Sequence, residues 1–162
     1  MRRGWILTIA ASALAVAGSL PAQAGGFGLG LSAALPTGDF GDYLDSGFGV
    51  HAMYKRPVTP LVQLTADVGW TRFGTADLTG DLGGFDGFAA ADDNLDVWNF
   101  TGGGKVDFMP FGLGLEYGYF SEIDEYGLVP NVGVSFTKFA VDLRYKATGD
   151  ANWFEVRAGL YF

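Results

Sequence analysis

The chain has 162 residues, of which 49% are hydrophobic, 15% aromatic and 17% charged, with 26 glycines and no cysteine. Its formal net charge of −8 argues against nucleic acid as a partner, because a polyanion would be repelled. The absence of cysteine excludes a disulfide framework and a lipoprotein anchor, so packing and charge pairing must supply the stability of what we expect to be one domain.

The N-terminal segment has the features of a secretory signal peptide. A basic pair at residues 2–3 precedes an apolar run over 5–20, and the alanines of Ala22-Gln23-Ala24 occupy the cleavage-site positions. The run is short for a membrane-spanning helix, and no later apolar stretch is long enough for one. We therefore predict a signal peptide over 1–24 and an outer-membrane β-barrel domain over 25–162.

The rest of the chain alternates in side-chain character with a period of two, which predicts an all-β domain. Every second position of each segment is mostly apolar, and the positions between carry glycine, polar or charged residues. The predicted strands lie at residues 26–36, 47–56, 61–72, 96–108, 111–120, 127–136, 139–147 and 153–162. An even number of antiparallel strands is typical of up-and-down transmembrane barrels in bacteria.

The connections between these strands alternate in length. The short ones lie at 57–60, near Pro110 and near Lys138, and the longer ones lie at 37–46, 73–95 and 121–126. Short turns at one end and long loops at the other are the pattern of outer-membrane barrels, in which the short turns face the periplasm.

The last predicted strand is the most informative. Its residues alternate between one face with Phe154, Val156, Ala158, Leu160 and Phe162 and another with Glu155, Arg157, Gly159 and Tyr161. Charges in so apolar a segment require that the second face meets water or opposite charge. An apolar edge in solvent recruits other chains, whereas a strand that closes a barrel in a bilayer has no free edge.

The polar faces of the strands are predicted to enclose a narrow lumen with balanced charge. This lumen charge network comprises Lys55, Asp67, Lys105, Asp107, Glu116, Asp142, Arg144, Lys146, Glu155 and Arg157. A last hairpin that turns at residues 149–150 places Arg144 opposite Glu155, and the same register places Asp142 opposite Arg157. A dry lumen requires such pairs, because an unpaired buried charge is strongly destabilising.

Aromatic residues and acids mark the two ends of the predicted barrel. We predict aromatic girdles at the membrane interfaces, formed by Trp70, Trp98 and Trp153 at the loop end and by Tyr54, Phe108 and Phe162 at the short-turn end. Most remaining acids fall in the long loops: Asp39, Asp42, Asp45, Asp77, Asp81, Asp86, Asp92, Asp93, Asp96, Glu122, Asp124, Glu125 and Asp150. We interpret them as a solvated, repulsive surface. A loop crown that gathers divalent cations is the alternative, although the acids lack the spacing of a defined metal site.

Taken together in this order, the features resemble the small eight-stranded outer-membrane barrels, the OmpA transmembrane domain and OmpX-like group. The resemblance also rests on the run into the first loop, residues 35–41, and on terminal Phe162. Gly159, Leu160 and Phe162 resemble the family's C-terminal signal for the barrel assembly machinery, except that Tyr161 lies on the lumen face. The resemblance implies a Gram-negative outer-membrane location among lipid and lipopolysaccharide. It also implies a structural, adhesion or surface-interaction role through the loops, with an unidentified extracellular ligand and without enzymatic activity or cofactor.

Three alternatives stay open. One is a lipid-modifying barrel enzyme, which would need a catalytic centre. Ser32, His51 and Asp67 share the lumen face, where a Ser/His/Asp arrangement is possible. We prefer to interpret His51 as a lumen histidine that is hydrogen-bonded to its neighbours. A narrow ion-conducting pore would use the lumen charges, although the interior of a barrel of this size is filled by side chains. A soluble periplasmic barrel around a hydrophobic ligand would require the apolar faces to point inward.

Overall fold

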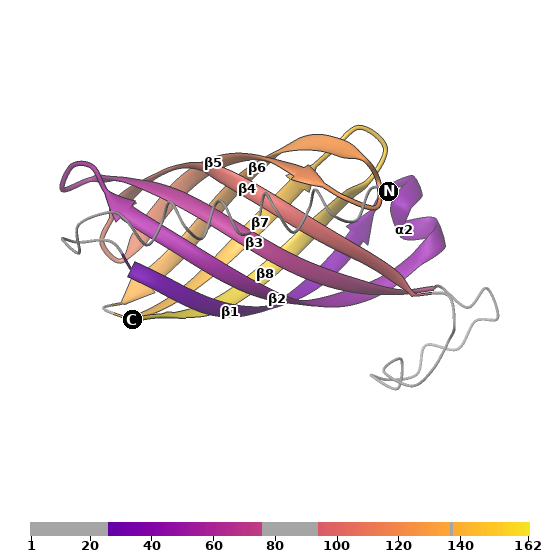
Figure 1. Cartoon of the computed structure of the whole chain (residues 1–162), viewed down its shortest axis with the longest axis horizontal. Coiled ribbons are helices and arrows are strands. Elements are labelled where there is room, and N and C mark those ends of the chain that lie inside the picture. Colours follow the sequence, from indigo (N-terminus) through magenta and orange to yellow (C-terminus); the bar gives the residue numbers. More distant parts are fainter. Residues whose placement is uncertain (1–25, 76–93, 137) are drawn as a thin grey trace, which may run out of the picture.

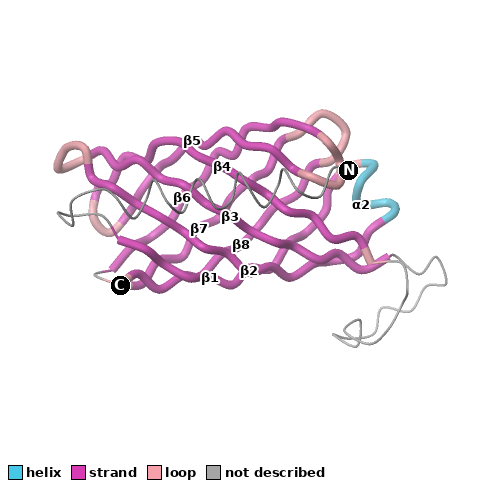
Figure 2. The backbone as a smooth tube through the Cα atoms, in the orientation of Figure 1, coloured by secondary structure: helices cyan, strands magenta, loops and turns pink. Residues whose placement is uncertain are grey.

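The computed structural model describes residues 26–75, 94–136 and 138–162, which form a closed antiparallel barrel with the strands in chain order (Figures 1 and 2). The elements are β1 Gly26–Thr37, α2 Asp39–Tyr43, β2 Leu44–Pro57, β3 Val62–Thr75, β4 Leu95–Phe108, β5 Phe111–Phe120, β6 Glu125–Phe136, β7 Phe139–Ala147 and β8 Asn152–Tyr161. The predicted signal peptide and the predicted loop acids between residues 77 and 93 lie outside the described residues.

Each strand pairs with the next, and β8 pairs with β1 to close the barrel. At this seam Leu31 lies opposite Ala158, and the hairpin of β7 and β8 turns between Ala147 and Asn152. All eight predicted strands are confirmed, with boundaries that differ most, by three residues, at the start of β2 and at the end of β3. Both extensions have one cause: a bulge before Gly47 lets Leu44 pair with Thr75 beyond the regular ladder of β2 and β3.

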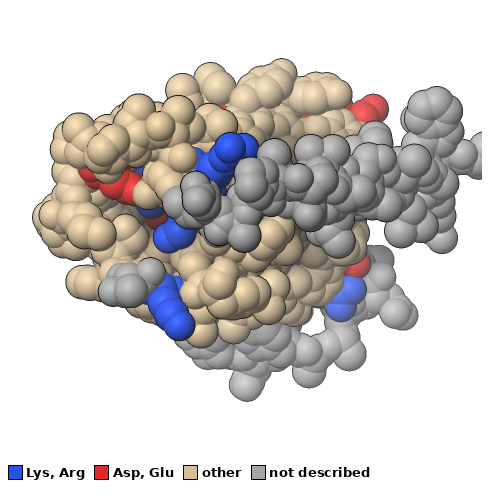
Figure 3. All heavy atoms as spheres, turned by 60° about the vertical axis from the view of Figure 1, so that its left-hand side comes forward, with Lys and Arg blue, Asp and Glu red and all other residues tan. Residues whose placement is uncertain are grey.

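The alternation of the strands turns the barrel inside out relative to a soluble protein. Apolar side chains on the outer wall are exposed, as in Leu31 at 68% and Leu160 at 58%, whereas charged side chains such as Arg144 and Glu155 are fully buried inside. On the face drawn in Figure 3, charged atoms gather at the short-turn end and the side wall is almost free of them. The soluble alternative, which required inward apolar faces, is therefore wrong for the described strands.

The one described helix, α2, lies at the end of the barrel opposite the C-terminus (Figure 1). It has only five residues, and within the described part of the chain no helix has the length and apolarity to cross a membrane. This finding does not bear on crossing by strands. Phe40 from α2 packs with its ring 5.8 Å from that of Trp153, so the helix covers the loop end of the lumen.

An apolar cluster fills the loop end of the lumen. Its buried members are Ala34, Phe73, Val97, Phe120, Val129, Ala151 and Trp153, and Phe40, Leu44, Leu95 and Ile123 pack against it. The rings of Phe73 and Phe120 meet Trp153 edge-on at 5.6 and 5.3 Å. The prediction that Trp153 belongs to an outer girdle is wrong, because its side chain is fully buried in this cluster. The alternation of β8 explains the error: Phe154 points outward, so Trp153 points inward with Glu155.

Candidate functional site

One buried arginine lies at the centre of the lumen. Arg144 on β7 donates from Nη1 to Glu155 Oε1 at 3.0 Å and to Asp67 Oδ1 at 3.3 Å. Its Nη2 donates to Glu116 and to Thr101 Oγ1, the latter at 3.2 Å. Because the three carboxylates come from β8, β3 and β5, one guanidinium joins strands on different sides of the lumen.

A second arginine extends the network toward the short-turn end. Arg157 on β8 donates from Nη1 to Asp67 Oδ2 at 2.8 Å and from Nη2 to Asp142 Oδ2 at 3.0 Å. Lys105 on β4 then donates to Asp142 Oδ1 at 2.7 Å. The register confirms both predicted cross-strand pairs, since Asp142 lies opposite Arg157 and Arg144 lies opposite Glu155.

Lys146 marks the border between the charged layer and the apolar cluster. Its ammonium donates to Glu155 Oε2 at 2.6 Å and to Asn99 Oδ1 at 3.2 Å. The same nitrogen lies 5.3 Å from the ring centroid of Trp153 and 5.9 Å from that of Phe120. The buried cation therefore faces carboxylate on one side and aromatic faces on the other.

The paired charges are equal in number. The four carboxylates are Asp67, Glu116, Asp142 and Glu155, and the four cations are Lys105, Arg144, Lys146 and Arg157. We call these eight residues the central network. Four carboxylates against four cations leave the central network without net charge, so it offers no excess charge that would attract ions of one sign.

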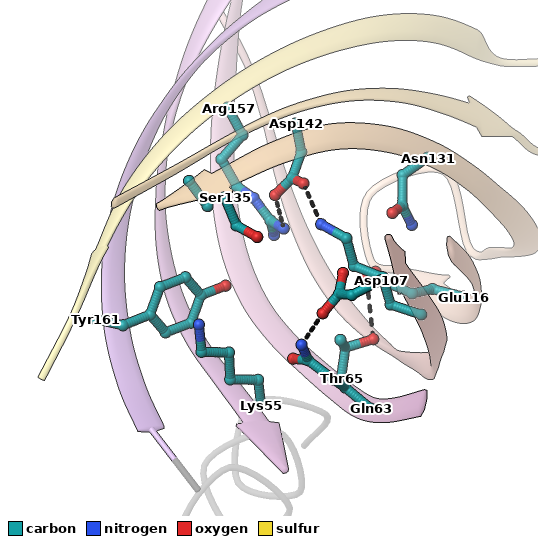
Figure 4. Close-up of a pocket in the computed structure, with 12 residues that line it drawn as sticks. Lys55, Gln63, Thr65, Asp107, Glu116, Asn131, Ser135, Asp142, Arg157 and Tyr161 are labelled. Carbon is teal, nitrogen blue, oxygen red and sulfur yellow. Dashed lines mark hydrogen bonds and ion pairs between the residues drawn. The ribbon is translucent and has the colours of Figure 1, made fainter. Parts of the chain in front are cut away.

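Two residues predicted for the network lie apart from it, at the short-turn mouth. Within the described residues neither Lys55 nor Asp107 forms an ion pair: the Lys55 ammonium lies 3.9 Å from the Tyr161 ring centroid, and Asp107 accepts a hydrogen bond from Gln63 Nε2. Both line a polar recess of about 370 Å³, including its open side, shown in Figure 4. The structure therefore places a polar, partly exposed vestibule between the central network and the short turns.

The structure brings together the Ser/His/Asp arrangement considered in the sequence. His51 Nε2 lies 2.9 Å from Ser32 Oγ, and His51 Nδ1 lies 3.1 Å from Asp67 Oδ1. All three side chains are buried, and Ser32 does not line the recess of Figure 4. A Cβ on Gly49 would lie 2.6 Å from Ser32 Oγ, so the hydroxyl is packed against the backbone of β2. This contact leaves no room on that side for an acyl group, and the geometry favours a structural hydrogen-bond chain.

A glycine creates the space for this histidine. A Cβ on Gly69 would lie 2.5 Å from His51 Nδ1 and 2.7 Å from Asn99 Oδ1. Asn99 in turn donates to Asp67 Oδ1 at 2.9 Å. The lumen-side glycines of the sequence therefore make room for long or ring side chains on neighbouring strands.

Most of the predicted girdle residues lie on the outer wall, toward either its loop end or its short-turn end. Trp70 and Trp98 lie opposite each other on β3 and β4, and Trp98 is 46% exposed. At the short-turn end Phe108 and Phe162 are exposed, and Tyr54 packs against Phe27 with ring centroids 4.9 Å apart.

The sequence interpretation missed a tyrosine group at the loop end, where the rings of Tyr117 and Tyr126 stack at 5.9 Å. The sequence does indicate them, because both are aromatic residues at outward positions near the loop ends of their strands. Of the predicted assembly-signal residues, Leu160 and Phe162 point outward, whereas Gly159 faces the lumen, where a Cβ would clash with Met53 Cε.

Comparisons with known proteins identify the fold. No protein-family model and no curated protein matches the chain. Among solved structures, Ail, the attachment invasion locus protein of Yersinia pestis, matches 85% of this chain and 97% of its own at 16% identity and a TM-score of 0.50. Ail in complex with the heparin analogue sucrose octasulfate matches 85% and 97% at 18% identity and 0.50. Neisserial surface protein A matches 85% and 95% at 16% identity and 0.53. The chain thus has the fold of small eight-stranded outer-membrane barrels.

Proposed function

We propose that the protein is a small integral outer-membrane barrel, closed to solutes, that acts as a structural, adhesion or surface-interaction protein through its acidic loops. The observation that carries the proposal is the combination of an apolar outer wall with a lumen filled by paired charges and an apolar cluster. On this orientation the short turns and the vestibule face the periplasm, and α2 and the long loops face outward.

The outer wall supports a lipid surrounding. Large apolar side chains are exposed on all eight strands, and they include Leu31, Val50, Leu64 and Leu113. A soluble monomer rarely exposes a continuous apolar surface of this extent, because such a surface drives association. In a bilayer the same side chains are solvated by acyl chains, and the closed ladder leaves no unpaired strand edge.

The lumen argues against a pore and against an enzyme. An ion entering from the vestibule would have to break charge pairs around Arg144 and then cross the apolar cluster around Trp153. A lipid substrate would have to reach Ser32, whose hydroxyl is packed against Gly49 and bonded to His51. We therefore propose that the loops, rather than the lumen, carry the function.

The charge of the loop end limits the kind of partner. Ail was crystallised with the heparin analogue sucrose octasulfate, which is a polyanion. On the outer wall and loops at this end of the described chain, Arg72 is the one basic residue, and Asp96 pairs with it. The same end carries further acids, Asp39 and Asp42 in α2 and Asp45 at the start of β2. We propose a loop partner that is basic, or that binds through divalent cations, rather than a heparin-like polyanion.

Reconstitution tests the proposal. The chain lacking residues 1–24 would be refolded into phospholipid vesicles and examined by thermal mobility shift on gels and by ion conductance. A shift without conductance is the expected result. Steady channels would overturn the closed lumen, and the absence of a shift would overturn the membrane barrel itself.

A further inference from the structure

The outer wall of β1 to β4 carries a shallow apolar groove near the loop end. Its volume, including the open side as for the recess of Figure 4, is about 490 Å³, and it is lined by Leu29, Val50, His51, Ala52, Val68, Trp70 and Trp98. The register explains its shape: Ala52 lies between Leu29 on β1 and Val68 on β3, so a small side chain stands between two larger ones. The row above joins Trp70 to Trp98 and closes the notch with two indole rings.

A polar pair lies directly beyond the indoles. Arg72 is opposite Asp96 in the next row, and it donates from Nε and Nη2 to the two carboxylate oxygens at 2.7 and 2.9 Å. Its guanidinium lies 5.2 Å from the Trp70 ring, and its side chain is 41% exposed. The pair fixes the guanidinium in one orientation. Within the described residues Nη1 makes no hydrogen bond, so it remains available to an outside acceptor.

We propose that this surface binds one glycolipid of the outer leaflet that carries a phosphorylated sugar headgroup. One acyl chain fills the notch at Ala52, the sugar lies against the exposed face of Trp98, and the phosphate accepts hydrogen bonds from Arg72. The unbonded Nη1 of Arg72 selects the position by hydrogen bonding rather than by net charge, because Asp96 neutralises the guanidinium and no other outward basic side chain lies at this end of the described barrel. The inference rests on the proposed membrane location and loop-out orientation.

The test measures retention of lipid A by native mass spectrometry after refolding in detergent. The wild-type protein should retain one molecule, and it should retain phosphatidylglycerol, which has a phosphate but no sugar, more weakly. Arg72→Gln should weaken lipid A binding about tenfold, as expected for the loss of a hydrogen bond to a charged group. Ala52→Leu, which fills the notch, should weaken it as well.

Matched substitutions elsewhere on the outer wall serve as controls. Arg56→Gln removes an exposed arginine at the short-turn end, and Ala158→Leu enlarges an exposed alanine on β8; both should bind lipid A like the wild type. Equal binding by Arg72→Gln, Ala52→Leu and the wild type would overturn the site, as would equal retention of phosphatidylglycerol. Each variant is first checked for the thermal gel shift, so failure of the barrel is distinguished from failure of the lipid site.

Discussion

Replacement of Arg144 by methionine tests whether the central network holds the barrel together. The variant removes one guanidinium that binds Glu155, Glu116 and Asp67. Glu155 would keep Lys146 at 2.6 Å, and Asp67 would keep Arg157 at 2.8 Å. These two carboxylates would therefore remain paired.

Glu116 determines the size of the effect. Without Arg144 its described partners are the hydroxyls of Thr101 and Thr65, at 2.7 and 3.2 Å, and it becomes a buried carboxylate without a cation. The removal of one partner from a buried pair costs about 3–5 kcal/mol, so we expect Arg144→Met to lower the free energy of unfolding by that amount. Urea unfolding of the refolded barrel in vesicles, followed by tryptophan fluorescence, measures it.

A double variant separates charge imbalance from loss of packing. Arg144→Met leaves four carboxylates against three cations in the central network, and a further Glu116→Gln restores three against three. We expect the double variant to recover at least about half of the lost stability, since the hydroxyl contacts of residue 116 can persist. A single variant within about 1 kcal/mol of the wild type, or a double variant no more stable than the single one, would refute this account.

Three further substitutions test other parts of the lumen. Trp153→Ala removes the centre of the apolar cluster, so it should lower the free energy of unfolding by about 3–5 kcal/mol and raise ion leakage in vesicles. Unchanged leakage would show that the central network alone closes the lumen. Gly69→Ala should cost about 1–3 kcal/mol, because its Cβ would displace His51. The control Gly74→Ala should be close to neutral in the same urea titration, because among the described residues its Cβ would meet nothing nearer than Asp45 at 3.6 Å. Ser32→Ala should leave the surface behaviour of the protein unchanged, and a fluorophosphonate probe should not label the wild type; labelling that Ser32→Ala abolishes would revive the enzyme alternative.

The strands and their faces could be predicted because the outer wall of this barrel is apolar and most of its lumen is polar. The polarity of a side chain indicates whether it points to the outer wall or to the lumen, so alternation alone predicted that Leu31 points outward and Arg157 inward. The pairing of Arg144 with Glu155 followed from the same alternation and a turn at residues 149–150, since neighbouring strands of a hairpin share one register.

Contacts across the lumen could not be predicted in this way. Arg144 on β7 reaches Asp67 on β3 and Glu116 on β5, and these contacts depend on barrel curvature rather than on a hairpin register. The depth of a residue along the axis was equally hidden, which is why Lys55 and Asp107 were assigned to a network from which the structure separates them.

The arrangement of Ser32, His51 and Asp67 has a structural explanation in the closure of the barrel. Ser32 lies on β1, His51 on β2 and Asp67 on β3, and Asp67 then accepts from Arg157 on β8. Ser32 is also opposite Arg157 in the seam between β1 and β8. The polar chain therefore runs through three strands and returns across the lumen to the strand that closes the barrel. Because it joins the first and last strands, it stabilises closure, and a histidine with hydrogen-bonding nitrogens on both sides of its ring is suited to its centre.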